Sequence, residues 1–292
     1  MAMTPQAELR ALLRHRRQLS RRPYLDVHLA DHCNLNCAGC LHYSPVAEHR
    51  LLDLDSYESD LKRLLEVPGI DDGFFEEVLL MGGEPLLHPE VARAITITSS
   101  YFKNTPVGLS TNGLLLSRMG EDFWKACRDA KLTIGISPYP IALGYEALAQ
   151  LVRDNGVEAR LLGDVTGNDK GKQVSWRLAL DETGSQNPTR SFALCQLDFT
   201  MQLRDGRIYP CNCGCYRAAL NRHFGTDFRH EAGDYLEIGD LTGTDQLYEL
   251  RSKPLPMCRY CNWEQARVVP WSRSHKAREE WIAPRDASGA SE

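Results

Sequence analysis

The stretch "DHCNLNCAGC", residues 31–40, decides the fold, because it places three cysteines on one short segment. These cysteines are Cys33, Cys37 and Cys40. The segment follows an apolar run, "PYLDVHLA" at 23–30, that is typical of a β-strand. An odd number of neighbouring thiols cannot pair off as disulfides, so the spacing indicates a metal or cluster site. A structural zinc site completed by His32 or His42 is the alternative.

The overall composition is that of an ordinary globular chain. It has 292 residues, 42% of them hydrophobic and 25% charged, with a formal net charge of −5. This balance gives no general attraction to nucleic acid or anionic membranes. We see no signal-peptide core and no run near the roughly 18 apolar residues of a membrane span, so we expect a cytoplasmic protein without membrane or nucleic-acid partners. Ten cysteines in a reducing compartment favour metal or cluster binding over disulfides.

Short β-type runs alternate with helical patterns over the first 180 residues. We expect strands at 23–30, 76–83, 106–113, 131–137, 157–162 and 174–180, and helices at 53–67, 89–103, 117–130 and 144–156. Strict alternation predicts parallel strands joined by right-handed crossovers, and therefore an incomplete barrel or an open α/β sheet. In both architectures the functional side chains gather at the carboxyl ends of the strands.

Unusual segments follow the first four predicted strands. The cysteine stretch follows the first strand, "MGGEP" (81–85) the second, "STNG" (110–113) the third and "SPYP" (137–140) the fourth. The carboxyl ends of parallel strands share one rim, so these segments should converge on one site.

The pattern changes after residue 180. A polar connector at 181–190 precedes a stretch at 196–211 that predicts a β-hairpin turning at Asp205 and Gly206. A second group of cysteines lies in this part of the chain: Cys195, Cys211, Cys213, Cys215, Cys258 and Cys261. The region is too small for an independent core, and a metal or cluster would explain its stability. Cys127, in a predicted helix, is expected in the core.

The first three rim segments together resemble motifs of the radical S-adenosylmethionine (radical SAM) superfamily. Cys33-x3-Cys37-x2-Cys40 resembles its signature loop, Met81–Pro85 resembles its "GGE" motif, and Ser110–Gly113 resembles the end of its third strand. The resemblance implies a partial (β/α)6 radical SAM barrel followed by a small C-terminal β-hairpin and helix domain. The boundaries that we predict are 1–22 for an N-terminal basic helix, 23–180 for the barrel, 181–270 for the small domain and 271–292 for a C-terminal tail.

The same resemblance implies a [4Fe-4S] cluster on Cys33, Cys37 and Cys40, with one iron left open to bind SAM. Its reductive cleavage would give a 5′-deoxyadenosyl radical, with electrons from a flavodoxin or ferredoxin-type donor. The residues implied in SAM binding are Gly82, Gly83, Glu84, Ser110, Asn112 and Ser137. Glu84 would accept a hydrogen bond from the methionyl ammonium, and the two glycines would let the backbone approach it.

One position departs from the family pattern. Gly39 stands where an aromatic or bulky residue commonly covers the adenine, so Leu41, His42 or Tyr43 would have to take that role. His42 and Tyr43 could equally face the substrate.

The second group of cysteines resembles the SPASM/twitch extension of radical SAM enzymes. Nothing beyond Cys261 supplies the further cysteines of a full SPASM domain, so the shorter twitch form with one auxiliary [4Fe-4S] cluster is implied. Its ligands would be Cys195, Cys211, Cys258 and Cys261. The crowded "CNCGC" leaves Cys213 and Cys215 as alternatives to Cys211, and a four-cysteine zinc site is the alternative for the whole group. At the level of motifs, the chain is similar to the twitch dehydrogenase that oxidises 2-deoxy-scyllo-inosamine in aminoglycoside biosynthesis.

The resemblance implies an enzyme that abstracts a hydrogen atom from a carbon of a small polar metabolite, such as a sugar or aminocyclitol. The outcome would be dehydrogenation, or epimerisation if Cys213 or Cys215 donates a hydrogen atom to the substrate radical. Candidate substrate contacts are His42, Tyr43, Tyr139 and Arg160. The alternative is modification of a ribosomally made peptide or a protein side chain.

Overall fold

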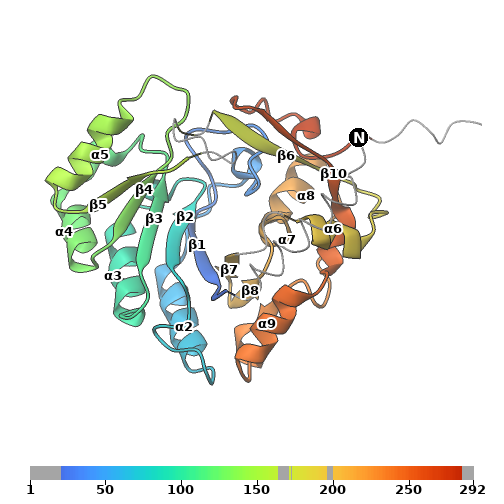
Figure 1. Cartoon of the computed structure of the whole chain (residues 1–292), viewed down its shortest axis with the longest axis horizontal. Helices are drawn as coiled ribbons and strands as arrows, with labels where there is room; N and C mark the ends of the chain where they lie inside the picture. The colour runs from blue at the N-terminus through green and yellow to red at the C-terminus, as the bar shows by residue number, and fades with distance from the viewer. Residues whose placement is uncertain (1–20, 164–170, 172, 196–199, 285–292) are drawn as a thin grey trace, which may run out of the picture.

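The computed structural model describes residues 21–163, 171, 173–195 and 200–284. Its first half is the predicted alternation of parallel strands and helices (Figure 1). The strands are β1 (Tyr24–Ala30), β2 (Val78–Gly82), β3 (Val107–Thr111), β4 (Thr133–Ile136) and β5 (Glu158–Leu161), and the helices are α2 (Leu54–Leu65), α3 (Val91–Tyr101), α4 (Glu121–Asp129) and α5 (Tyr145–Asp154). Neighbouring strands from β1 to β5 pair in parallel, so the predicted α/β fold class is confirmed.

The sheet continues beyond β1 in a way that corrects one expected strand. The order is β5-β4-β3-β2-β1-β7-β8-β9, and β7 (Thr200–Arg204) pairs in parallel with β1. The run at 174–180, expected as a sixth barrel strand, is β6, which pairs antiparallel with β10 (Cys261–Pro270) in a separate sheet. The three central residues of β7 are all buried, as a strand covered on both faces requires.

The predicted hairpin is confirmed. β7 and β8 (Arg207–Tyr209) pair antiparallel around Asp205 and Gly206, whose φ angles are 52° and 74°. Two consecutive positive φ values are those of a type I′ turn, which Asp-Gly favours. The remaining short strand, β9 (Leu236–Glu237), extends this hairpin.

A second hydrophobic cluster surrounds the C-terminal cysteines. It contains Cys213, Cys215 and Cys261, and residues of the cysteine loop, including Tyr43, complete it. The helices of this half are α6 (Pro188–Leu194), α7 (Asn212–Tyr216), α8 (Ala218–Phe224) and α9 (Thr244–Ser252). The cluster is therefore formed mainly by the C-terminal region, with the cysteine loop packed against it.

A buried ion pair orders the loop that precedes Cys258. Arg217 Nη2 donates to Asp234 Oδ2 at 3.0 Å, and both side chains are almost fully excluded from solvent. Asp234 Oδ1 accepts the Met257 N–H at 2.8 Å, so this pair fixes the backbone next to the cysteine. Buried charges need such partners.

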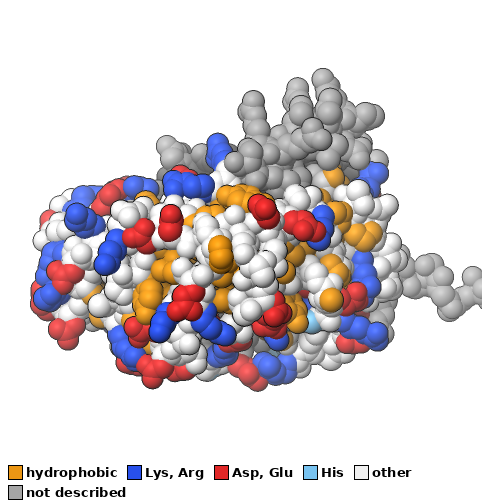
Figure 2. Space-filling view, turned by 90° about the horizontal axis from the view of Figure 1, so that it is seen from below, with side chains coloured by type: hydrophobic (Ala, Val, Ile, Leu, Met, Phe, Trp, Pro, Cys, Tyr) orange, Lys and Arg blue, Asp and Glu red, His pale blue; other side chains and the backbone are white. Residues whose placement is uncertain are grey.

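The face seen in Figure 2 mixes acidic and basic side chains, with apolar side chains between them. On the molecular surface, exposed ion pairs join Arg93 to Asp55 and Lys125 to Asp129. Within the described ranges, no helix is long and apolar enough to cross a membrane. The predicted N-terminal helix lies outside the described residues except at positions 21 and 22.

Candidate functional site

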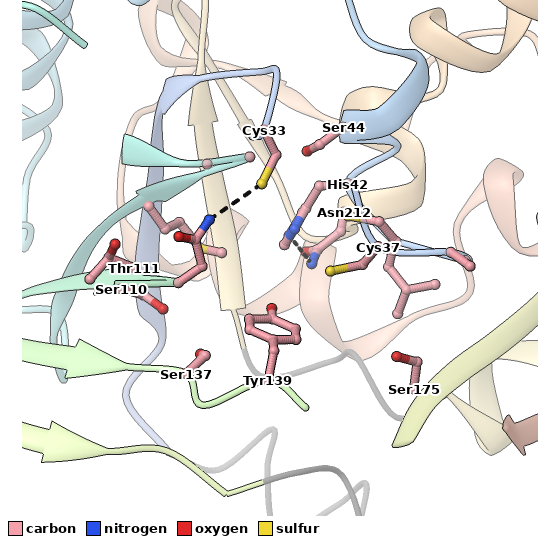
Figure 3. Close-up of a pocket in the computed structure, with 18 of the residues that line it drawn as sticks. Cys33, Cys37, His42, Ser44, Ser110, Thr111, Ser137, Tyr139, Ser175 and Asn212 are labelled. Carbon is pink, nitrogen blue, oxygen red and sulfur yellow. Dashed lines mark hydrogen bonds between the residues drawn. The ribbon is translucent and has the colours of Figure 1, made fainter. Parts of the chain in front are cut away.

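A pocket of about 280 Å³ lies at the carboxyl ends of β1 to β4 (Figure 3). Its lining combines the cysteine loop with the ends of the next three strands and with parts of β6 and α7. The lining residues used below are Cys33, Cys37, Cys40, Leu41, His42, Ser44, Gly82, Gly83, Ser110, Thr111, Asn112, Ser137, Tyr139, Ser175 and Asn212. The predicted convergence of the rim segments is therefore confirmed.

The glycines after β2 hold the cysteine loop by close backbone contact. The Gly83 N–H donates to the Ala30 carbonyl at 2.8 Å, and the Glu84 N–H donates to the His32 carbonyl at 3.1 Å. A Cβ on Gly83 would overlap the His32 carbonyl, and one on Gly82 would overlap that of Ala30. Glycine is required here by the loop itself, in addition to any approach of a ligand.

The C-terminal strap, residues 271–281, holds the same loop from the other side. The Ala38 N–H donates to the Ser272 carbonyl at 2.9 Å, and the Ser274 N–H donates to the Asn36 carbonyl at 2.7 Å. Trp281 Nε1 donates to the Cys40 carbonyl at 2.9 Å. The part of the predicted tail that the structure describes is thus packed against the site.

The three loop cysteines are half-buried in one pocket, and their surroundings suit a cluster. The Leu35 N–H donates to Cys33 Sγ at 3.4 Å, and Asn112 Nδ2 lies 3.7 Å from the same sulfur (Figure 3). Burial raises the pKa of the Cys33 thiol to about 12, so its thiolate form needs a nearby cation. Soft thiol donors with N–H groups directed at sulfur fit a [4Fe-4S] cluster.

The polar residues at the ends of β3 and β4 form a connected wall. Asn112 Nδ2 donates to Asn34 Oδ1 at 2.8 Å, and Asn112 Oδ1 accepts the Leu114 N–H at 3.0 Å. The Ser137 N–H donates to the Thr111 carbonyl at 2.9 Å. Ser110, Asn112 and Ser137, which were predicted to bind SAM, all line the pocket.

The C-terminal cysteines form a second thiol group, the auxiliary set, defined as Cys195, Cys211, Cys213, Cys258 and Cys261. The neighbouring Cys213 thiol lowers the pKa of Cys261, but burial and the nearby Cys211, Cys258 and Cys195 thiols raise it to about 11, so these thiols lie near one another. The Cys211 side chain accepts the Gly214 N–H at 3.4 Å and so caps α7. Burial raises the pKa of the Cys258 thiol to about 12. The donor chemistry again suits an iron–sulfur cluster, although no group of His, Cys, Asp or Glu among the described residues is gathered as for a single metal ion.

The segment that carries the first of these sites is similar to a known family. Residues 27–138 match the model of the radical SAM superfamily. These residues therefore resemble a radical SAM domain. This domain implies one [4Fe-4S] cluster and SAM, for which the cysteine loop and the rim residues are the candidates.

Similarity to individual proteins is limited. GTP 3′,8-cyclase from Trichodesmium erythraeum (strain IMS101) is 35% identical over 103 residues, which is 35% of this chain and 31% of that protein. The enzyme of the same name from Aliarcobacter butzleri (strain RM4018) is 36% identical over 98 residues, 34% of this chain and 29% of that protein. The chain thus spans about a third of the length of the curated relatives it matches.

Two solved structures are similar to different lengths of this chain. BtrN in complex with AdoMet and 2-DOIA is 14% identical, covers 83% of this chain and 94% of that chain, and has a TM-score of 0.48. Native anSMEcpe with bound AdoMet and the Cp18Cys peptide is 23% identical, covers 48% of this chain and 42% of that chain, and has a TM-score of 0.34.

Glu84 of the radical SAM domain does not face the pocket as predicted. Its carboxylate is buried, and Oε1 accepts hydrogen bonds from Thr111 Oγ1 at 2.6 Å and from the Leu86 N–H at 3.2 Å. Oε2 accepts the Asn112 N–H at 2.9 Å. Burial raises the pKa of Glu84 to about 7. The side chain joins the end of β2 to the end of β3.

Cys213 and Cys215, predicted as hydrogen-atom donors, do not line the pocket. Cys213 is buried, 1% exposed, and lies beside Cys211 and Cys261 of the auxiliary set. Cys215 lines a separate cavity of about 80 Å³ beside Arg204 and Tyr216. Both are buried residues of α7.

Two of the four predicted substrate contacts line the pocket, and two do not. Tyr139 and His42 line the pocket, the Tyr139 hydroxyl lying beside the Cys37 thiol. Tyr43 is buried in the second hydrophobic cluster and does not line it. Arg160 is exposed on β5 and pairs with Glu158 at 2.8 Å, because residues two apart on a strand share a face, here the solvent face.

The sequence prediction missed several polar lining residues, among them Ser44, Ser175 and Asn212. Asn212 Nδ2 lies 2.9 Å from His42 Nε2, so the second cysteine region supplies one wall of the pocket. The position of Asn212 inside "CNCGC" was the available signal, since a residue between two candidate ligands must lie near the site. Ser175 belongs to β6, whose pairing with β10 the sequence did not predict.

Proposed function

We propose that the chain is a radical SAM dehydrogenase that acts on a small hydroxyl-rich metabolite, such as a sugar or aminocyclitol. One observation carries this proposal. The pocket that presents the three loop cysteines also presents hydroxyl, amide and imidazole groups, and its described lining contains no Lys, Arg, Asp or Glu. Hydroxyl groups are recognised by such neutral donors and acceptors. A triphosphate such as GTP would call for cationic side chains, which the described part of this lining lacks.

When bound, the cluster and SAM supply a 5′-deoxyadenosyl radical that abstracts a hydrogen atom from a substrate carbon. The chain's own residues position and enclose the reactants. Cys33, Cys37 and Cys40 would hold the cluster, and the backbone of Gly82 and Gly83 with the side chain of Asn112 would orient SAM beside it. Leu41, which lines the pocket two residues after Gly39, would take the place of the missing aromatic against the adenine.

The positions of the cysteines favour dehydrogenation over epimerisation. Epimerisation needs a hydrogen-atom donor in the pocket, and neither Cys213 nor Cys215 lines it. Dehydrogenation needs an acceptor for the second electron and a base for the hydroxyl proton. We assign the acceptor role to an auxiliary [4Fe-4S] cluster on Cys195, Cys211, Cys258 and Cys261. We assign the base role to His42, which the nearby Asn212 orients.

Anaerobic turnover with deuterated candidate substrates tests the proposal. The reconstituted chain should hold about eight irons, transfer deuterium into 5′-deoxyadenosine, and release a product two hydrogens lighter than the substrate. Zinc in place of iron, with no 5′-deoxyadenosine formed, would show that the chain is not such an enzyme. A product of unchanged mass that gains deuterium from heavy water would indicate epimerisation. Label transfer from peptides but not from sugars or aminocyclitols would select the peptide alternative.

A further inference from the structure

Tyr43 has an unusual backbone conformation next to the cysteine loop. It lies three residues after Cys40, with φ 57° and ψ 22° in the left-handed region that bulky residues rarely adopt. Its N–H donates to the Cys40 carbonyl at 3.0 Å, and its own carbonyl accepts the Val46 N–H at 3.0 Å. Such outliers persist where the surroundings hold them, often at functional sites.

The Tyr43 side chain crosses from this loop to the auxiliary set. The residue is 1% exposed and belongs to the second hydrophobic cluster. The loop that carries it packs against α8, beside α7 (Figure 1). Burial first, and then the neighbouring Cys213 thiol, raise the pKa of Tyr43 well above its usual value, with Cys261 and Cys211 contributing further. Because Tyr43, Cys213 and Cys261 belong to one buried cluster, the phenol lies among the thiols from which the auxiliary site is built.

The hydroxyl of Tyr43 lacks a satisfactory acceptor. Across the described part of the chain, no hydrogen bond of normal geometry satisfies the Tyr43 hydroxyl. Burying a phenolic O–H without an acceptor is unfavourable, so buried tyrosines nearly always have one. Tyr57 illustrates the usual case, because its equally buried hydroxyl lies 2.8 Å from Thr98 Oγ1. The neighbouring acceptors for this hydroxyl are the sulfur atoms of Cys213, Cys261 and Cys211.

We propose that the Tyr43 hydroxyl donates a hydrogen bond to a ligand sulfur of the auxiliary cluster beside Cys213, that of Cys211 or Cys261, and thereby raises the reduction potential of that cluster. This inference rests on the auxiliary cluster of the proposed function. A hydrogen bond to sulfur stabilises the reduced cluster more than the oxidised one, because reduction adds negative charge. Tyr43 is thus a positioning and tuning residue rather than a substrate contact. Since its backbone is bonded to Cys40, it also ties the tuning group to the loop of the first site.

The test isolates the auxiliary cluster. The parent for comparison is the full chain with Cys33→Ala, Cys37→Ala and Cys40→Ala, reconstituted anaerobically with iron and sulfide. Tyr43→Phe is then added to this parent, and Tyr57→Phe is added separately as a matched loss of a buried hydroxyl. The readouts are iron per chain, circular dichroism, and the midpoint potential from a dye-mediated titration followed by electron paramagnetic resonance.

We expect about four irons per chain in all three proteins and a midpoint potential shifted to a more negative value in Tyr43→Phe alone. In resonance Raman spectra, exchange of the parent into D₂O should shift the Fe–S stretching bands more than the same exchange of Tyr43→Phe. An unchanged potential, an equal shift in Tyr57→Phe, or equal D₂O effects would overturn the inference while leaving the auxiliary cluster in place. Loss of iron from Tyr43→Phe alone would make the residue structural and also overturn it. A parent that holds no iron would refute the auxiliary cluster itself.

Discussion

At the scale of single residues, the loop after β1 is defined by contacts that leave little space. Gly83 lies directly on the His32 backbone, and Ala38 is bonded to the C-terminal strap. The three cysteines keep their positions because backbone groups on both sides of the loop are hydrogen-bonded. Small changes of volume here should therefore affect the cluster site before they affect the rest of the fold.

Gly83→Ala tests this constraint. The new Cβ would overlap the His32 carbonyl, so the loop must move, and we expect a loss of about 3 kcal/mol in stability together with most of the iron bound at the first site. Gly239→Ala is the matched control, because a Cβ there meets nothing within 4 Å and should change stability by less than about 0.5 kcal/mol. Urea unfolding and iron analysis measure both. Full iron retention in Gly83→Ala would contradict the predicted constraint.

Cys37→Ala separates the two cysteine groups. Removing one ligand of the first site should lower the iron content from about eight to about four per chain and abolish SAM cleavage, since the auxiliary set is untouched. Cys127→Ala serves as the control, because Cys127 is buried in α4 away from both groups and should leave iron unchanged. If Cys37→Ala keeps all of its iron, Cys37 is not a ligand.

The sequence predicted which elements carry these residues, but it did not predict the directions of their side chains. The spacing of Cys33, Cys37 and Cys40 indicated that they share one site. The position of this site at the rim of the sheet followed from the predicted order of strands and helices. The inward direction of Glu84 depends on donors from β3, which are distant in sequence. Arg160 was placed on the correct strand, but its face depends on the register of β5 against β4, which no local pattern shows.

At the scale of elements, the seam between β1 and β7 joins the barrel to the hairpin. The pairing is parallel, and side chains from the two strands meet in the interior. Gln202 Nε2 donates to Asp26 Oδ2 at 2.8 Å, while Asp26 Oδ1 has no partner within the described residues. The sequence could not distinguish β7 from β6 as the next strand, because both runs are short and partly apolar and the choice depends on long-range pairing.

Asp26 makes this seam sensitive to pH. Burial raises its pKa from 3.8 to about 7, although the Gln202 hydrogen bond opposes the shift. Between these two values the folded state binds more protons at Asp26 than the unfolded state, so this group lowers stability as pH rises from about 4 to 7. The loss is complete above pH 7, where the folded state must hold a buried carboxylate.

Asp26→Asn should therefore be more stable than the unaltered chain at pH 8, by on the order of 2–4 kcal/mol, with little difference near pH 4. Urea unfolding at both pH values measures the change. Asp129→Asn is the control, because Asp129 is exposed and its ion pair with Lys125 contributes at most about 1 kcal/mol. A stability difference for Asp26→Asn that does not depend on pH would argue against a raised pKa.

At the scale of the whole molecule, the C-terminal part of the described chain returns to pack against the cysteine loop. β10 begins at Cys261 of the auxiliary set and leads directly into the strap that holds the cysteine loop. The two cysteine groups, about 150 residues apart in sequence, are thus joined by one strand and by Tyr43. The sequence indicated two cysteine-bearing regions, but the strap could not be predicted, because its contacts are mostly backbone hydrogen bonds that leave no mark on residue type.

Trp281→Phe tests whether the end of the chain holds the first cluster. The change keeps most of the buried ring but removes the N–H that donates to the Cys40 carbonyl at 2.9 Å, at a cost of about 1–2 kcal/mol. Because the lost bond lies on the cysteine loop, iron of the first site should leave faster when a chelator is added, while auxiliary iron is retained. Trp124→Phe removes a comparable bond, from Nε1 to the Met119 carbonyl at 3.2 Å, within the outer helical layer. It should cost similar stability without faster iron loss, so equal rates of iron loss in the two variants would mean that the strap does not secure the cluster loop.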